Sequence, residues 1–328
     1  MRRRKLLVAG AVALAGPLVA RAQQPARPTP KVYRIGVLEG TSMSGNRPNF
    51  DAFRDGLRDL GYVEEKNIVI EYRSADGRVE RFAELAAELA KAQVDILVAR
   101  GTPAALAAKA TGLPVVMSGV ADPTSPELVA SLAKPGGNVT GLATLVRELT
   151  AHRIAVLKEL LPKTGRIGNL LNLGNPAGVA QWKETETAAK ARELEPVLLD
   201  VRKPKNFAEA FEAASAKKVD ALLVNPDPLI IEHRRAVAEF AARHKLPAIY
   251  AETEFVEAGG LISYGVYYPH LYYRAAGYVD RILKGAKPAE LPVEQPTRFL
   301  LYINVRAAKN LGLSVPPTLL QRADRIIG

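Results

Sequence analysis

The first candidate for ligand chemistry is a short polar loop that carries three hydroxyl groups. Thr41, Ser42 and Ser44 follow an apolar run, and Gly40 and Gly45 flank them. Hydroxyl groups and glycine N–H groups at this spacing suit a carboxylate ligand. The alternative is a solvated polar loop that binds nothing.

Two further candidates lie at the starts of predicted helices. Gly101 and Thr102 precede Pro103, a residue favoured in the first turn of a helix, so the Thr102 hydroxyl can bind an anion or cap its own helix. Asp122 follows another predicted strand, where its carboxylate can meet a ligand ammonium or cap a helix that begins near Thr124. We favour the ligand role for Asp122 and leave both interpretations open for Gly101 and Thr102.

The second half of the chain offers Asn175 and Asp227 in similar positions. Each follows a predicted strand, and each stands beside a proline. Asn and Asp next to proline are typical of turns, so a turn role competes with ligand binding at both positions.

Three candidates near the end of the chain add aromatic faces and a second carboxylate. Tyr250, Glu252 and Tyr267 follow late predicted strands, and tyrosine rings suit an aromatic or amphipathic ligand. Several tyrosines lie between residues 267 and 273, and helical spacing lets only some of them face a cleft. Among them we expect Tyr267 to face the cleft. The alternative is that these tyrosines pack the following helix in the core and at an interface.

No catalytic motif accompanies these residues. The sequence contains no G-x-S-x-G, no H-E-x-x-H and no Walker A pattern, its four histidines are isolated, and it has no cysteine. We therefore expect no enzyme activity, no metal and no cofactor. The alternative is an exported hydrolase that acts on a small polar substrate, with Glu252, Glu254 and Glu257 as a source of paired carboxylates.

The amino-terminal segment predicts export. Residues 2–5 are basic, residues 6–20 are apolar, and an A-x-A pattern ends at Ala22, which indicates a signal peptide cleaved after Ala22 and a linker over residues 23–30. The apolar run is shorter than the roughly 20 residues of a membrane span. Both the Sec and the twin-arginine routes remain open.

The positive charge of the chain does not predict a nucleic-acid partner. Five of its +11 formal charges lie in the first 22 residues, and no basic cluster interleaved with aromatic residues stands out in the rest. We expect no nucleic acid and no direct membrane insertion after cleavage.

The elements that must position the candidates alternate between strand and helix. The predicted strands of the first half are residues 32–38, 67–72, 94–99 and 113–117, and the predicted helices are residues 47–60, 78–91, 103–111 and 125–133. This order predicts a parallel sheet with helices on both faces.

Short sequence patterns of the first half recur in the second half. Residues 34–36 (RIG) recur as residues 166–168, the run VDILV from residue 94 recurs as VDALLV from residue 219, and LP at residue 113 recurs at residue 246. Three matches in one order at nearly one offset predict two similar Rossmann-like α/β lobes, with residues 135–141 as a candidate crossover.

The last part of the chain is expected to pass back to the first lobe and return. Predicted strands cover residues 248–251, 261–265 and 299–304, and a helix covers residues 271–284 with Gly285 at its end. The predicted first lobe is residues 31–141 plus about 266–292, and the second is residues 142–265 plus about 293–328. Several crossing strands form a hinge, and a cleft lies at the carboxyl ends of the strands.

The motifs make the chain resemble one family. They are residues 53–62 (FRDGLRDLGY), 67–73 (NIVIEYR), 101–109 (GTPAALAAK), 134–141 (KPGGNVTG) and 254–261 (EFVEAGGL), and they resemble the ABC transporter substrate-binding proteins of the tryptophan/tyrosine-binding-like family over nearly all of the mature chain. The resemblance implies the type I periplasmic binding protein fold, a periplasmic location, and delivery of a small molecule to a membrane permease. We expect a monomer.

The expected ligand is an amino acid or an aromatic carboxylate. A hydroxyl-rich loop, acidic candidates and several tyrosines favour these classes over a sugar, for which more tryptophan in the cleft is expected than the single Trp182.

Overall fold

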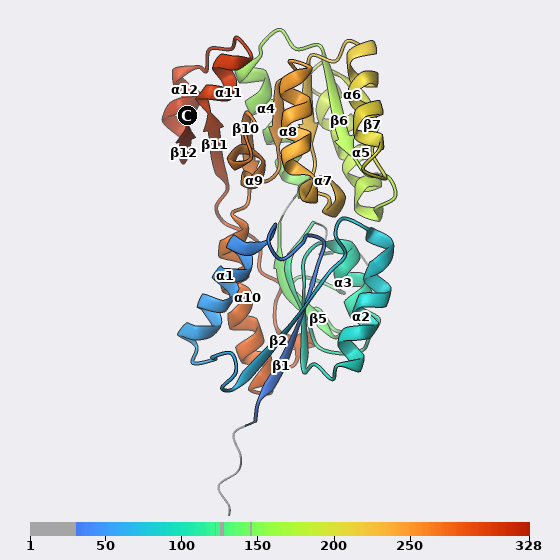
Figure 1. Ribbon diagram of the computed structural model, residues 1–328, viewed down its shortest axis with the longest axis vertical. Helices are drawn as coiled ribbons and strands as arrows, with labels where there is room; N and C mark the ends of the chain where they lie inside the picture. The colour runs from blue at the N-terminus through green and yellow to red at the C-terminus, as the bar shows by residue number, and fades with distance from the viewer. Residues whose placement is uncertain (1–30, 122, 125–127, 145) are drawn as a thin grey trace, which may run out of the picture. The chain divides into compact units, whose positions relative to one another are not determined.

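The computed structural model describes residues 31–121, 123–124, 128–144 and 146–328, and the fold lies in the unit Val32–Gly328. The elements of its first half are β1 Tyr33–Glu39, α1 Arg47–Asp59, β2 Ile68–Ser74, the 3₁₀ turn η1 Val79–Arg81, α2 Phe82–Lys91, β3 Ile96–Ala99, α3 Thr102–Lys109, β4 Val115–Val120 and β5 Val139–Ala143. Figure 1 shows these elements in blue and green.

The elements of the second half begin with helix α4. They are α4 Val146–Leu160, β6 Arg166–Leu171, α5 Pro176–Lys190, β7 Glu195–Asp200, α6 Asn206–Ala216, β8 Ala221–Val224, α7 Pro228–Glu232, α8 Arg234–Arg243, β9 Ala248–Tyr250, α9 Thr253–Glu257, β10 Ile262–Gly265, α10 Tyr268–Leu283, the 3₁₀ turn η2 Pro288–Glu290, β11 Leu300–Asn304, α11 Val305–Asn310, α12 Pro317–Arg322 and β12 Arg325–Ile327.

Two sheets organise these strands. Within the described residues the first has the order β2-β1-β3-β4-β5 and is parallel throughout, and the second has the order β12-β11-β10-β9-β8-β6-β7 with one antiparallel pair, β10 with β11. A helix follows most strands, which lets the next strand run in the same direction. This confirms the predicted α/β class with parallel sheets.

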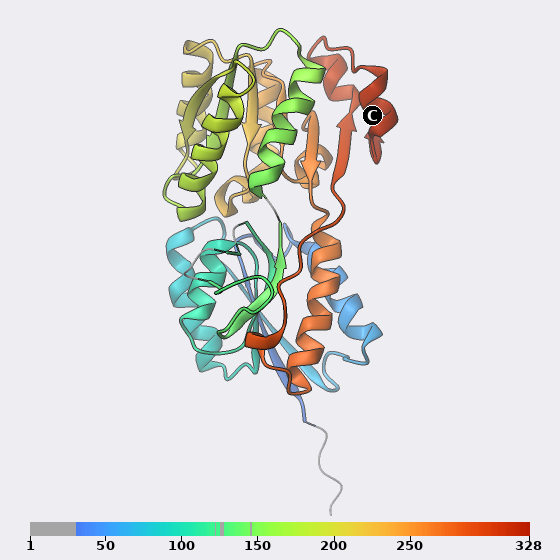
Figure 2. The ribbon, with the colours of Figure 1, turned by 180° about the vertical axis from the view of Figure 1, so that it is seen from behind.

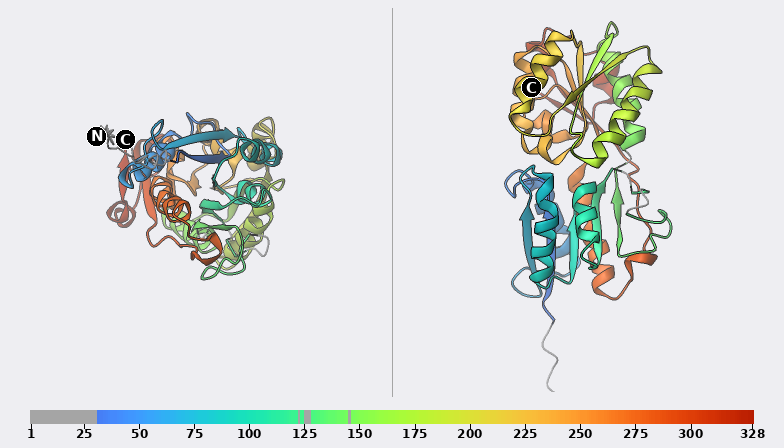
Figure 3. Two further views of the ribbon diagram at one scale, coloured as in Figure 1. Left: turned by 90° about the horizontal axis from the view of Figure 1, so that it is seen from below. Right: turned by 90° about the vertical axis from the view of Figure 1, so that its right-hand side faces the viewer.

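Each sheet is the centre of one lobe. The first lobe consists of β1–β5 with α1, α2, α3 and α10, and the second consists of β6–β12 with the remaining α-helices. Apolar clusters lie on both faces of each sheet, and the right panel of Figure 3 shows helices on either side of the strands. Strands buried on both faces read as continuous apolar runs, which is why the sequence shows them clearly.

Helix α10 returns the chain to the first lobe. It packs along α1, and its buried face, which includes Tyr272 and Ala276, joins Phe53 of α1 in one apolar cluster. Figure 2 shows the segment after α10 running beside β5, where Thr140 donates a hydrogen bond to the carbonyl of Leu291 at 2.6 Å. The chain therefore passes between the sheets after β5, after β10 and before β11.

The internal repeat has a structural counterpart. Sheet order β2-β1-β3-β4-β5 in the first lobe matches β7-β6-β8-β9-β10 in the second. The backbone N–H of Arg34 donates to Asp95 at 2.7 Å, and the N–H of Arg166 donates to Asp220 at 2.8 Å. The repeated residues thus make the same contact twice, at the start of the first strand in each lobe.

One predicted helix is wrong over its described part. Residues 128–133 of the predicted helix 125–133 form turns and bends, and residues 125–127 lie outside the described residues. Leu128 and Val129 are buried in the first lobe, and the Ser131 side chain donates to the Lys134 carbonyl at 3.1 Å. The apolar side chains are thus buried without a helical backbone. The hydrogen bond from the Ser131 side chain to the backbone stabilises a loop in place of the helix.

Candidate functional site

A cavity of about 50 Å³ lies at the carboxyl ends of strands from both sheets. Its polar and aromatic lining residues are Glu39, Thr41, Arg100, Thr102, Thr144, Asn175, Gln181, Asp227, Glu252 and Tyr268. They follow β1, β3, β5, β6, β8, β9 and β10, because parallel strands present their carboxyl ends at one edge of a sheet.

Six of the predicted site residues line this cavity. They are Thr41, Gly101, Thr102, Asn175, Asp227 and Glu252. The predicted Asp122 lies outside the described residues. The remaining predicted residues, Ser42, Ser44, Tyr250 and Tyr267, do not line the cavity.

Two threonines place hydroxyl groups at the cavity. Thr41 and Thr102 are both buried, and no hydrogen-bond partner for either hydroxyl occurs among the residues that the structure describes. Helix α3 begins at Thr102, and its cap, Gly101, has a φ of +82°, a conformation that favours glycine. The Thr102 hydroxyl therefore does not cap its helix, and both hydroxyls are available to a ligand.

Asn175 and Asp227 combine a capping role with a place in the cavity wall. Asn175 accepts from Ala177 N at 3.0 Å, and Asp227 accepts from Leu229 N at 2.8 Å. The Asn175 amide also donates to Asp227 Oδ2 at 2.9 Å. Burial raises the pKa of Asp227, and these hydrogen bonds oppose the rise. The predicted turn role is thus observed at both positions, and their contacts hold the wall in place.

The serines of the first loop lie at the rim of the cavity. The backbone N–H of Ser42 donates to Glu232 Oε2 of the second lobe at 2.9 Å, and the Ser42 hydroxyl lies 3.4 Å from that of Ser44. The loop also meets Arg234, which donates to the Gly45 carbonyl at 3.2 Å. Ser42 and Ser44 line a neighbouring surface groove, so they contribute to contact between the lobes.

Two predicted tyrosines face away from the cavity. Tyr250 is 1% exposed and stacks on Phe255 with ring centroids 4.6 Å apart, inside the core of the second lobe. Tyr267 is 42% exposed and lines a separate groove beside Tyr273. Tyr268, the next residue, starts α10 and lines the cavity, since successive residues project in different directions.

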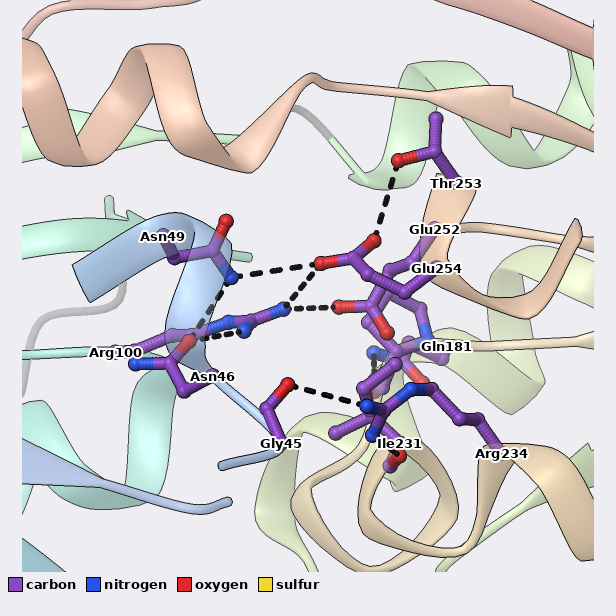
Figure 4. Close-up of polar contacts among 11 residues, drawn as sticks. Gly45, Asn46, Asn49, Arg100, Gln181, Ile231, Arg234, Glu252, Thr253 and Glu254 are labelled. Carbon is purple, nitrogen blue, oxygen red and sulfur yellow. Dashed lines mark hydrogen bonds and ion pairs between the residues drawn. The ribbon is translucent and has the colours of Figure 1, made fainter. Parts of the chain in front are cut away.

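Arg100 is the centre of a polar cluster that joins the two lobes (Figure 4). Its guanidinium lies 2.8 Å from Glu252 Oε1 and 3.8 Å from Glu254 Oε1, and it donates to Asn46 Oδ1 at 3.4 Å. The same guanidinium lies 3.9 Å from the ring centroid of Tyr268, a cation–π distance. Buried charges need partners of this kind.

Glu39 and Glu252, two buried carboxylates near this guanidinium, have pKa values above the ordinary range of a glutamate. Burial raises the pKa of Glu39 to about 7, against the lowering effect of the Arg100 charge. Burial likewise raises the pKa of Glu252 to about 7, and Arg100 again opposes it. Perturbed carboxylates in a cleft are typical of functional sites.

Glu39 and Arg100 are the main charged cavity residues that the sequence-based prediction missed, whereas Tyr268 was among the tyrosines considered but ranked behind Tyr267. Glu39 ends β1, and Arg100 directly follows β3. A charged residue at the carboxyl end of an otherwise apolar strand was the available signal, because that end is the binding edge of a parallel sheet. Both stand one or two positions before the predicted residues Thr41, Gly101 and Thr102.

Within the described ranges, no group of three or more His, Cys, Asp or Glu residues is arranged to hold a metal ion. In the same ranges, no helix combines the length and apolar character needed to cross a membrane.

Comparison with known proteins identifies relatives over most of the chain. Residues 34–327 match the family model of the ABC transporter substrate binding proteins. A tyrosine-binding protein of Clostridioides difficile (strain R20291) is 29% identical over 84% of this chain and 80% of its own length.

Two solved structures are similar in sequence and in fold. A domain from Streptococcus pneumonia in complex with L-Trp is 28% identical, with a TM-score of 0.82 over 90% of this chain and 100% of its own. The ligand-free, open form of a substrate binding protein with adhesive properties from Clostridium difficile is 25% identical, with a TM-score of 0.64 over 90% of this chain and 99% of its own.

Proposed function

Because the chain belongs to the family of ABC transporter substrate binding proteins, we propose that it captures a small molecule, an amino acid or an aromatic carboxylate, between its two lobes and delivers it to the membrane permease. The observation that carries the proposal is the cavity at the facing strand ends of the two sheets, with Thr41, Arg100 and Glu252 in its lining. Two relatives support the ligand class: one is a tyrosine-binding protein, and the other was solved with L-Trp.

The fold agrees with this function. The two α/β lobes and the crossing segments form the type I periplasmic binding protein fold that the sequence predicted. As lobe boundaries we propose residues 31–141 plus about 266–292 for the first lobe and residues 142–265 plus about 293–328 for the second, with the last two residues of β5 still in the first sheet.

The lining of the cavity suits an amino acid. Tyr268 offers an aromatic face, the hydroxyls of Thr41 and Thr102 can donate to a carboxylate, and Glu39 and Glu252 can accept from an ammonium. An aromatic carboxylate, the second predicted class, uses the first two features and leaves the carboxylates without a partner.

The proposed mechanism is closure of the lobes around the ligand. A ligand that touches both lobes stabilises the closed form more than the open form, and only this difference shifts the population. The cavity is lined from both lobes, so a ligand that occupies it makes contacts of this kind.

Proteins of this family act in the periplasm or outside the cell, and they bind small ligands for a permease. For this chain we propose in addition that the signal peptide is cleaved after Ala22 and that the mature protein works as a monomer without nucleic acid. The family gives the hydrolase alternative no support, and we propose that the ligand leaves the protein chemically unchanged.

Thermal unfolding of the purified protein tests the proposal. A ligand at 100 times its dissociation constant stabilises the folded state by about 2.7 kcal/mol, which raises the unfolding midpoint of a chain of this size by about 5 °C. We expect such a shift with L-tyrosine or L-tryptophan and none with sugars or nucleosides. Mass spectrometry of the ligand recovered afterwards is expected to show it unmodified. A shift with sugars alone would contradict the proposed ligand class.

A further inference from the structure

Arg153 is a buried guanidinium of the second lobe that lies outside the cavity lining and has incomplete hydrogen bonding. It belongs to helix α4 and is 1% exposed, and its Nε donates to the Tyr264 carbonyl at 2.7 Å. Its Nη1 has no hydrogen-bond partner in the described part of the chain. A buried donor left without an acceptor is costly, so the protein holds this guanidinium at an energetic disadvantage when the lobes are together.

Glu252 carries the complementary unpartnered atom. It is 2% exposed, and its Oε1 accepts from Arg100 of the first lobe at 2.8 Å (Figure 4). Its Oε2 has no partner among the described residues. Glu252 follows β9 closely, and α4 packs against β9 and β10, so Glu252 and Arg153 are neighbours within one lobe.

The charges of these two residues act on each other. Burial lowers the pKa of Arg153 to about 10, and the Glu252 charge is among the effects that oppose this change. Burial raises the pKa of Glu252, and the charges of Arg100 and Arg153 lower it. Arg153 and Glu252 therefore attract each other across a buried space, yet Glu252 makes its hydrogen bond to Arg100.

Opening of the lobes changes which partners Glu252 can reach. Arg100 directly follows β3, so it moves away with the first lobe, whereas Arg153 stays with Glu252 in the second. Once Arg100 has left, the Glu252 carboxylate has lost its hydrogen-bonded cation, and Arg153 still has a donor without an acceptor. A guanidinium presents several N–H groups in a fixed fork, so Arg153 can bond a carboxylate and keep its bond to Tyr264.

We propose that Glu252 exchanges partners when the lobes open, pairing with Arg100 in the closed form and with Arg153 in the open form. Arg153 is thus a positioning residue that favours the open form, because closure leaves its Nη1 buried without an acceptor. The inference rests on the closure mechanism of the proposed function and adds the residue that opposes closure.

A distance measurement on the ligand-free protein tests the inference. The chain has no cysteine, so Glu80→Cys and Lys203→Cys place two nitroxide labels at exposed positions after β2 of the first lobe and β7 of the second. Electron paramagnetic resonance then gives the populations of the short and the long distance between the lobes. We expect Arg153→Met to raise the closed-to-open ratio at least about fivefold, since it removes the partner of Glu252 from the open form alone.

An unchanged or lower ratio in Arg153→Met would overturn the inference. A parent protein that is closed throughout would also overturn it, because Arg153 would then have no open form to favour. The matched control is Lys158→Met, which makes the same charge change at the other end of α4 and should leave the ratio unchanged.

A double-mutant cycle separates this role from a purely structural one. Because Arg153 acts through Glu252, Arg153→Met should have no effect on the ratio in a Glu252→Gln background. Equal effects in the two backgrounds would assign Arg153 a structural role and overturn the inference. If Arg153→Met does not fold, Arg153→Lys takes its place in both backgrounds. Lysine lacks the fork, so we expect a smaller shift towards the closed form, and no shift would overturn the inference.

The inference and the proposed function can fail separately. The distances are measured without ligand, so a failure of amino acids to bind contradicts the proposed ligand class and leaves the distance result decisive for Arg153. Where L-tyrosine binds, we expect Arg153→Met to bind it more tightly than the parent does, because a larger share of the protein is already closed. Weaker binding by this variant would contradict the inference.

Discussion

Contacts at the rim of the cavity offer a test of closure that leaves the ligand untouched. Glu232 accepts a hydrogen bond from Ser42 N at 2.9 Å, and Arg234 donates one to the Gly45 carbonyl at 3.2 Å. We call these two contacts the rim latch. Glu232 and Arg234 belong to the second lobe, Ser42 and Gly45 belong to the first, and none of the four lines the cavity. The perturbation is the double substitution Glu232→Ala, Arg234→Ala.

The expected magnitude follows from the type and exposure of these contacts. Hydrogen bonds to charged groups contribute about 1.5–3 kcal/mol each when well buried. Both side chains of the latch are partly exposed, so water replaces part of the lost interaction, and about 1 kcal/mol each is expected. When the lobes separate, both contacts are lost, so the closed form alone loses about 2 kcal/mol. Affinity should fall about 30-fold.

Surface binding kinetics and calorimetry measure this effect. We expect the loss to appear mainly in the dissociation rate, because most interface substitutions act there, and the order of preference among ligands should not change. The control is the double substitution Arg235→Ala, Glu239→Ala, which makes the same charge change at exposed positions of α8. If the latch variant binds like the control, the contacts do not support closure and the reasoning is refuted.

Three further predictions follow from individual residues. Because burial raises the pKa of Glu39 to about 7, its carboxylate is protonated below that pH and cannot bind an ammonium. Affinity for an amino acid should therefore fall about tenfold for each pH unit below 7. Calorimetry at several pH values should show a shallower dependence of affinity on pH for Glu39→Gln. A Cβ on Gly40 would lie 2.6 Å from Pro228 Cβ of the other lobe, so Gly40→Ala should weaken ligand binding by about tenfold while the unfolding midpoint stays unchanged. Asn175→Ala removes a helix cap and a donor to Asp227, and thermal unfolding should show a loss of about 1–3 kcal/mol.

The fold was predictable because its signals are local. Strands buried on both faces read as short apolar runs, and amphipathic helices between them imply parallel pairing. The repeat was equally visible, since Asp95 and Asp220 follow the same valine in each half and make the same hydrogen bond to the first strand. The helix predicted over residues 125–133 was wrong where it is described, because burial of Leu128 and Val129 does not require helical backbone.

The candidate site was predictable only in part. Loop positions after parallel strands identified Thr41, Thr102 and Glu252, because strand direction places those loops at one edge. Sequence cannot tell which of two adjacent tyrosines, Tyr267 or Tyr268, faces the cavity, since a rotation at the start of α10 decides it.

The sequence by itself determined the class of fold, the order of its elements and the loops that form the binding edge, because strand and helix periodicity are properties of neighbouring residues. The tertiary structure decided which charges are paired. Arg100 and Glu252 are distant in the chain and meet only when the two lobes come together, and the Arg100 charge also acts on the buried Glu39. Charge compensation depends on the distance between the charged groups and on their burial, and the local sequence determines neither.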